Sequence, residues 1–452
     1  MADGTVYRAG GAVNLTAQGN VALGRVEAGT NPITVIATTG AISDNTAAEG
    51  AGNENLVGGD LNLLAASGVG APGGSTDIDT AATRIDTATG SGGIYLAETD
   101  AVQLGNTGPI TTGSGGGAIA VTAGGTMTLA QAVTTAGSGS ISLTTTAGDL
   151  QVGQAVSAGG GLSLDAAGLL HITAAVSGSR VELAGGTGIT HTAAGDVTSG
   201  STITATATTG DIDMADGARY QAAGDATLTA QGNVGLGHID AGGNTLTVTA
   251  TAGAISDNTA AEGAGNENLV AGNLSLTVGT GIGAPGAAAN IDTAADKINA
   301  QTTRSGDIYL AETDAVTLGS TTGISSAAGA DIAIKSGGEM TVGAGGVQAF
   351  ASGDVRLTAT AGDLAIGGEV ATDSGDLELT AGRSIRQAEG RLLRTRNDNQ
   401  GTLALRSGQA IGTADAPILT DVAVLAAEAT GGGVFATQVD GTQGNLAPFC
   451  MY

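Results

Sequence analysis

The sequence has no tryptophan, eight phenylalanine and tyrosine residues together, six prolines and one cysteine among its 452 residues. With so few aromatic side chains, alanine, valine, leucine and isoleucine must supply nearly all the buried surface, which excludes a conventional multidomain globular protein with aromatic-anchored cores. The single cysteine, Cys450, excludes an internal disulfide. No run of about 18 apolar residues is present, so we expect no membrane-spanning helix.

Basic residues are also scarce, since 15 lysines and arginines stand against 42 aspartates and glutamates, for a net charge of -27. Such a charge repels nucleic acid and anionic membranes, so we expect neither as a partner and no membrane insertion. The histidines, His171, His191 and His238, are isolated in the sequence, and the glycine clusters lead into strands and not into a helix. We therefore predict no cofactor, no metal site and no catalytic residue.

Glycine is what the sequence has in excess, at 80 residues in a chain that is 41% hydrophobic and 13% charged. This composition is too apolar and too sparsely charged for a disordered chain, and the glycines follow no three-residue period, which excludes a collagen-like chain. The remaining class is an ordered all-β protein with glycine-rich turns.

A long internal repeat covers most of the chain. The segment GAISDNTAAEGAGNENLV occurs at 40–57 and again, unchanged, at 253–270, an offset of 213 residues. We divide the chain into repeat unit 1 at 1–213, repeat unit 2 at 214–382, divergent arginine-rich repeats at 383–440 and a C-terminal tail or cap at 441–452. Because Met1 aligns with the internal Met214, we expect the chain to be a segment of a longer array.

A shorter repeat of about 25 residues runs through both units. In GAVNLTAQGNVALG at 11–24, for example, Val13 and Leu15 alternate with polar residues before the corner at Gly19, and Val21 and Leu23 alternate after it. One such repeat cannot bury its apolar face alone, so we predict a parallel β-helix (β-solenoid) of about 18 rungs, an elongated rod of roughly 85 Å. We expect 43–57 and its copy at 256–270 to project from it as a loop or short helix.

Two further segments carry a family resemblance. GDIYLAETDAVTLG at 306–319 and IGTADAPILTDVAVLAAEATGGGVF at 411–435, together with the alternating repeat, resemble the repetitive region of filamentous-haemagglutinin-like proteins, the two-partner-secreted adhesins of Gram-negative bacteria. The resemblance implies a right-handed parallel β-helix, located outside the cell or on its surface, that acts in adhesion, biofilm or filament building. Of the NPNGI-like motifs of the family's secretion domain only Asn31-Pro32-Ile33 is present, so we expect the export signals to lie outside this chain.

Two pairs of carboxylates, Asp77 with Asp79 and Asp211 with Asp213, lie two residues apart and therefore on one face of a strand. That spacing suits a glycosidase or a calcium site. The copy of the first pair is Asn290 with Asp292, however, and acids on a strand face usually point into water. We expect both pairs to be solvated surface.

Six of the 15 basic residues are concentrated near the end of the chain: Arg383, Arg386, Arg391, Arg394, Arg396 and Arg406. One hypothesis is an assembly contact, in which the basic end of one molecule meets the acidic flank of the next in a head-to-tail array. The alternative is local pairing with acids such as Glu389 and Asp398. Sulfates or phosphates of polysaccharides are a third hypothesis.

Cys450 lies in LAPFCMY at 446–452. One hypothesis is an intermolecular disulfide or an anchor for the carboxyl terminus, since an odd thiol in an exported protein invites intermolecular pairing. The alternatives are a thiol without function and an apolar tail that covers the last rung, whose edge would otherwise pair with other chains.

We therefore predict a non-enzymatic structural protein, the β-solenoid shaft of a secreted adhesin or the body of an extracellular filament. Its partner would be a further copy of itself or a host, cell-surface or matrix component. A β-helical polysaccharide lyase or hydrolase is the first alternative. An ice-binding solenoid is the second, because threonine occupies alternate positions at 202–209 and 245–251, although threonine is also an ordinary strand residue.

Overall fold

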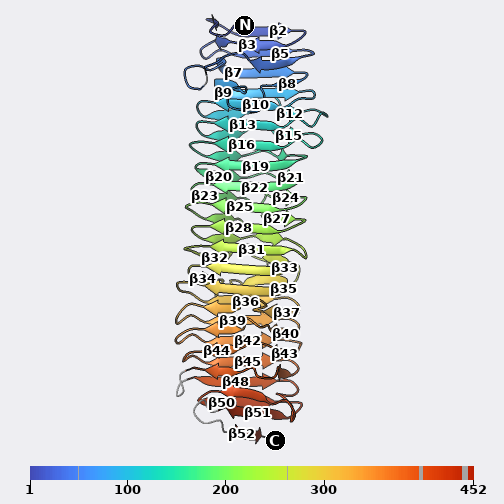
Figure 1. The fold of residues 1–452 in the computed structure, drawn as a ribbon, viewed down its shortest axis with the longest axis vertical. Helices are drawn as coiled ribbons and strands as arrows, with labels where there is room; N and C mark the ends of the chain where they lie inside the picture. The colour runs from blue at the N-terminus through green and yellow to red at the C-terminus, as the bar shows by residue number, and fades with distance from the viewer. Residues whose placement is uncertain (49, 262, 397–400, 440–445, 452) are drawn as a thin grey trace. The chain divides into compact units, whose positions relative to one another are not determined.

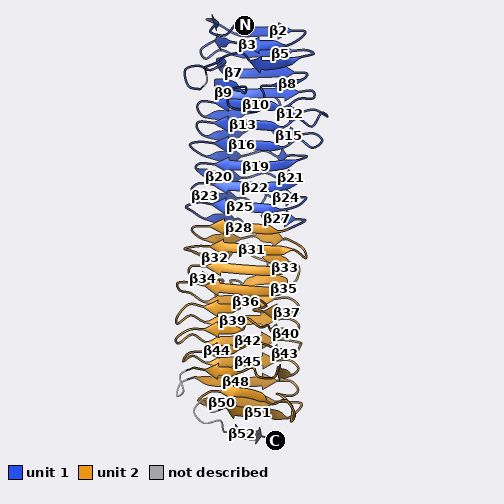
Figure 2. Cartoon of the chain, viewed as in Figure 1, with its two compact units in different colours: residues 1–224 blue, residues 225–452 orange. Residues whose placement is uncertain are grey.

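The computed structural model describes residues 1–452 except 49, 262, 397–400, 440–445 and 452, and for 446–451 it describes the backbone alone. The chain packs into two compact units, residues 1–224 and 225–452 (Figure 2). This boundary lies eleven residues after the end of the first sequence repeat at 213. β27 (Arg219–Ala222), which lies between these two positions, pairs with β24 (Val197–Ser199) of the first unit.

Both units are all-β, and the described residues contain no helix. The strands pair in parallel, and a strand generally pairs with the one three positions later in the chain, so that three strands make one rung (Figure 1). The fold is a β-solenoid of about 18 turns, which confirms the fold predicted from the repeat length. The described residues include no helix that is long and apolar enough to cross a membrane.

Most strands contain two to six residues. Those of the first unit are β1 (Val6–Arg8), β2 (Val13–Ala17), β3 (Val21–Leu23), β4 (Arg25–Glu27), β5 (Ile33–Ala37), β6 (Ala41–Asp44), β7 (Leu56–Ala65), β8 (Gly68–Val69), β9 (Ile78–Thr89), β10 (Ile94–Glu98), β11 (Val102–Leu104), β12 (Ile110–Thr112), β13 (Ile119–Ala123), β14 (Met127–Leu129), β15 (Val133–Thr135), β16 (Ile141–Thr145), β17 (Leu150–Val152), β18 (Val156–Ser157), β19 (Gly161–Ala166), β20 (Leu169–Ile172), β21 (Val176–Gly178), β22 (Arg180–Gly185), β23 (Gly188–His191), β24 (Val197–Ser199), β25 (Ile203–Ala207), β26 (Ile212–Met214) and β27 (Arg219–Ala222).

Those of the second unit are β28 (Ala226–Ala230), β29 (Val234–Leu236), β30 (His238–Asp240), β31 (Thr245–Ala250), β32 (Ala254–Asp257), β33 (Leu269–Val278), β34 (Gly281–Ile282), β35 (Ile291–Thr302), β36 (Ile308–Glu312), β37 (Val316–Leu318), β38 (Ile324–Ser326), β39 (Ile332–Ser336), β40 (Met340–Val342), β41 (Val347–Ala349), β42 (Val355–Ala359), β43 (Leu364–Ile366), β44 (Val370–Thr372), β45 (Leu377–Ala381), β46 (Ile385–Gln387), β47 (Leu393–Thr395), β48 (Thr402–Ser407), β49 (Ile418–Asp421), β50 (Val424–Ala429), β51 (Val434–Val439) and β52 (Leu446–Met451).

The register of these pairings explains the composition of the core. One column of facing, buried residues in the first unit runs Ile94, Ile119, Ile141, Leu162, Val181 and Ile203. A second column, two residues along each strand, runs Leu96, Val121, Leu143, Leu164, Leu183 and Ala205. Since successive side chains point to opposite faces, the residues between these columns point outward. The core is therefore built of stacked aliphatic side chains.

Each unit has two successive long strands that continue through a position where other rungs have a corner. β7 and β9 pair through both halves of their length, and β33 and β35 repeat this arrangement. The loops that precede β7 and β33, residues 45–55 and 258–268, form turns and bends in their described parts. We expected a loop or a short helix in these segments, and their described parts form a loop.

The end of the second unit departs from the parallel pattern. β51 pairs in parallel with β49, but β52 pairs with β51 in the antiparallel sense. Residues 446–451 of the expected tail or cap at 441–452 are therefore a strand on the edge of β51, and residues 441–445 lie outside the described residues.

Two equivalent corners bring successive rungs together at glycine. A Cβ atom on Gly92 would lie 1.6 Å from the carbonyl oxygen of Ser67, and one on Gly306 would lie 1.3 Å from that of Thr280. Gly306 also has a φ of +85°, a conformation that alanine adopts only with strain.

We expect Gly306→Ala to lower the free energy of unfolding by about 2–4 kcal/mol, because the backbone must move and the residue must keep a left-handed conformation. Gly243→Ala is the matched control in the same unit, since its Cβ would meet no atom within 4 Å, and it should change stability by less than about 0.5 kcal/mol. Denaturant unfolding followed by circular dichroism measures both, and equal stabilities would contradict the role given to this corner.

Candidate functional site

A buried polar cluster in the first unit lies where loop 45–55 enters β7. Asn55 is 1% exposed, and its Nδ2 donates to Asp44 Oδ1 at 2.5 Å while its Oδ1 accepts from the backbone N–H of Asp79 at 2.9 Å. Asp79 is itself 5% exposed, and its Oδ2 accepts from the N–H of Gly50 at 3.0 Å. Asn55 thus ties the loop to β6 and to β9.

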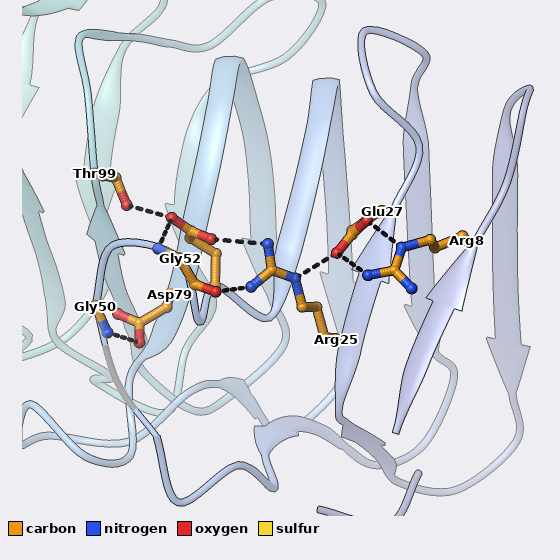
Figure 3. Close-up of polar contacts among 8 residues, drawn as sticks. Arg8, Arg25, Glu27, Gly50, Gly52, Asp79 and Thr99 are labelled. Atoms are coloured by element: carbon orange, nitrogen blue, oxygen red, sulfur yellow. Dashed lines mark hydrogen bonds and ion pairs between the residues drawn. The ribbon is translucent and has the colours of Figure 1, made fainter. Parts of the chain in front are cut away.

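Beside this cluster, charges of opposite sign alternate over neighbouring strands (Figure 3). Arg8 Nε donates to Glu27 Oε2 at 2.8 Å, and Arg25 Nε donates to Glu27 Oε1 at 2.7 Å. Arg25 also donates to the carbonyl oxygen of Gly52 and lies 3.5 Å from Glu54, which is 6% exposed. The hydrogen bond from Arg8 is the main cause that lowers the pKa of Glu27. A groove of about 370 Å³ opens beside Arg8 and Arg25, but both guanidinium groups are already paired.

The second unit repeats the anchoring with one change. Asn268 Nδ2 donates to Asp257 Oδ1 at 2.7 Å, and its Oδ1 accepts from the N–H of Asp292 at 2.9 Å. At the position of Arg25 the second unit has His238, whose Nδ1 lies 2.6 Å from the carbonyl oxygen of Glu267. Because the same bonds occur in both copies, we assign this cluster to holding the loop.

A buried glutamate lies next to each loop. Glu98 is 3% exposed, and its carboxylate accepts from the hydroxyl of Thr80 at 2.7 Å and from the N–H groups of Ala82 at 3.0 Å and Asp100 at 3.2 Å. Glu312 in the second unit makes the equivalent bonds. Burial raises the pKa of both glutamates to about 7, although the donors favour the ionised form.

These glutamates should make stability fall as the pH rises. An unfolded glutamate titrates near 4.5, so their contribution is complete below that pH and is lost as the pH rises through about 7, by up to about 3 kcal/mol for each group. We expect Glu98→Gln to remove part of this dependence and Glu98→Gln with Glu312→Gln to remove more. Urea unfolding at a series of pH values measures the slope. The partly exposed Glu182→Gln is the control, and a double variant with the wild-type slope would overturn the assignment.

The three histidines occupy separate rungs, and only His191 is buried. Its Nδ1 lies 3.0 Å from the carbonyl oxygen of Gly195, so Nδ1–H donates there and Nε2 accepts from the hydroxyl of Tyr220 at 2.7 Å. Tyr220 is fully buried, and the two rings meet edge to face. Burial lowers the pKa of His191 to about 4. Among the described residues no group of three or more His, Cys, Asp or Glu side chains is arranged to hold a metal ion.

His191 should act on stability in the opposite direction to the glutamates. An unfolded histidine titrates near 6.5, so the contribution is complete above that pH and is lost as the pH falls through about 4, by up to about 3 kcal/mol. We expect the double variant His191→Leu with Tyr220→Phe to lose less stability than wild type between pH 7 and pH 4. Urea unfolding measures this difference. His171→Leu is the control, and if the double variant lost as much stability as wild type, His191 would not be neutral in the folded state.

The expectation that both carboxylate pairs are solvated is wrong for the first. Asp211 and Asp213 are exposed, but Asp79 and its copy Asp292 are buried under their loops. Asp77 is half-buried, and its pKa is raised by burial first and by the charge of Asp79 second. The alternation of residues along one strand could not reveal this burial, because the loop that covers Asp79 lies about 30 residues earlier in the chain. The sequence signal that could have indicated it is the unchanged repetition of that loop in the second unit.

The structure pairs four of the six arginines near the end of the chain with acids one rung earlier. Arg386 lies 3.1 Å and Arg383 3.8 Å from Asp363, while Arg396 lies 3.5 Å from Asp373. Arg394 and Arg396 also contact Glu369. The local acids named from the sequence are not these partners: Glu389 has no ion pair with a described residue, and Asp398 lies outside the described residues.

The remaining proposed assembly residues are Arg391, Arg406 and Cys450. Arg391 and Arg406 are exposed and make no ion pair within the described part of the chain, so the assembly hypothesis now depends mainly on them. Cys450 lies in β52 opposite Phe435 of β51, but its side chain is outside the described residues. The intermolecular disulfide stays a prediction.

Threonine pairs are stacked in the second unit. Thr247 and Thr249 of β31 lie opposite Thr227 and Thr229 of β28 and opposite Ser275 and Thr277 of β33. In the first unit Thr204 and Thr206 of β25 lie opposite Glu182 and Ala184. The threonine columns are therefore short, and ice binding stays a minor hypothesis.

Comparisons with protein-family models, with curated proteins and with solved structures found no match to this chain.

Proposed function

We propose that this chain is a structural protein, the β-solenoid shaft of a secreted bacterial adhesin or of an extracellular filament. The observation that carries the proposal is the unbroken register of the core columns within each unit, in which each rung extends the strands and the apolar stack of the one before. A stack of this kind resists bending and shear, because neighbouring rungs share hydrogen bonds and apolar contacts along their whole length.

The polar clusters support the same role. In the first unit the loop is fixed against the rungs by hydrogen bonds of Glu54, Asn55 and Asp79. In the second unit Asn268 and Asp292 form the corresponding hydrogen bonds. The glycosidase hypothesis gains no support from Asp79, since its carboxylate is bound to the N–H of Gly50 beneath the loop. We infer that the anchored parts of these loops are held in place on the surface and are available for weak, repeated contacts.

Negative-stain electron microscopy of the purified full chain tests the proposal. We expect slender particles of uniform width, and compact globules would overturn the proposal that the chain is a shaft.

If the chain also assembles, particles should join end to end at about 20 mM salt and separate at about 500 mM, because salt screens the exposed charges. Arg391→Ala with Arg406→Ala should then abolish joining, whereas Arg180→Ala, an exposed arginine of the first unit, should not. Single particles at every salt concentration would support the role of a spacer and contradict the role of a self-assembling filament.

A further inference from the structure

A polar groove lies on an outward face of the second unit. It has a volume of about 320 Å³ and crosses β36, β39, β42, β45 and β48. The side chains that give it its chemistry are Tyr309, Asp331, Asp354, Arg356, Asp376 and Arg406. A second hollow of about 190 Å³ adjoins it and shares Tyr309 and Arg356.

One wall of the groove is a column of aspartates. Oδ1 of Asp331 accepts from the N–H of Asp354 at 2.9 Å, and Oδ1 of Asp354 accepts from the N–H of Asp376 at 2.7 Å. Asp376 continues the column by accepting from Thr402 at 2.6 Å. Each carboxylate is thus held in place through one oxygen, and its Oδ2 has no hydrogen-bond partner among the described residues. The free oxygens repeat at the rung spacing of about 4.8 Å.

The other wall is the next outward column. Tyr309, Ala333, Arg356, Glu378 and Ala404 follow one another in register. Arg356 and Glu378 form an ion pair at 2.7 Å, and the two alanines leave space on either side of that pair. The Tyr309 hydroxyl donates to Asp307 at 3.3 Å, which holds the ring at one end of the groove.

The first unit has a different surface at the same register. Tyr95 takes the place of Tyr309, but Ala118, Ser140 and Gly161 stand where the second unit has its three aspartates. Ser142 likewise replaces Arg356. The core columns beneath are equivalent, so at this register the groove's side chains are present in the second unit and absent from the first.

We propose that this groove binds a linear, uncharged polysaccharide. Sugar hydroxyls donate to carboxylate oxygens and accept from guanidinium groups, both of which the groove offers, and the apolar face of a sugar ring packs on a tyrosine ring. A row of fixed acceptors at a constant spacing suits a polymer with a regular repeat. A polyanion would be repelled by the aspartate column. This binding is additional to the mechanical role, which does not require it.

Isothermal titration of the full chain tests the proposal with two probes, the β-1,4-linked hexasaccharides of glucose and of N-acetylglucosamine. We expect at least one to bind, and Tyr309→Ala to weaken that binding by about tenfold or more. Asp354→Ser with Arg356→Ser gives the second unit the residues found at Ser140 and Ser142, so it should fold normally and also lose binding. Tyr95→Ala, the matched change in the first unit, should leave binding unchanged.

The proposal is overturned if neither hexasaccharide binds, or if the two groove variants bind as well as wild type. It is also overturned if an anionic heparin hexasaccharide binds in their place. Micrographs of the double serine variant separate this result from the shaft proposal, because lost binding with unchanged particle shape concerns the groove alone.

Discussion

Parallel stacking at about 4.8 Å places the same position of successive rungs directly above one another, and the rest of the structure depends on this constraint. A core column is filled mostly by side chains that pack well against a similar neighbour on both sides. Isoleucine, leucine and valine do so in the core, where they pack without polar atoms to satisfy. At the corners the backbones themselves come into contact, and positions such as Gly306 have no room for a Cβ atom.

The same constraint makes a column of like charges costly, and the aspartates of the second unit show how that cost is reduced. Each Asp331, Asp354 and Asp376 carboxylate accepts a hydrogen bond from a backbone N–H of the next rung, which gives one of its oxygens a fixed partner. The buried groups solve the problem differently. His191 remains neutral through burial, whereas Glu98 and Glu312 titrate near neutrality, so their effects on stability oppose each other at intermediate pH.

The fold was predictable because its signals are local. Alternation around Val13 and Leu15, glycine at the corners and a repeat of about 25 residues are each visible within one rung, and together they define the solenoid. The candidate sites were less predictable because they join residues one rung apart. Asp363 pairs with Arg383 and Arg386 although some 20 residues separate them, and Asp79 is buried by a loop that begins at residue 45. Such contacts can be predicted only when the number of residues in each rung is known.

The internal duplication shows which positions are free to acquire a function. Most inward positions of the two copies are aliphatic and the anchors Asn55 and Asn268 are the same, because a change there would disturb the rung above and the rung below. Outward positions are not bound in this way, so Ser140 in one copy can be Asp354 in the other with the strand beneath unaltered. A solenoid thereby separates mechanical requirements from surface chemistry more completely than a globular fold does. New binding surfaces on such a chain should therefore arise as outward columns several rungs long, and the polar groove proposed to bind a polysaccharide has this form.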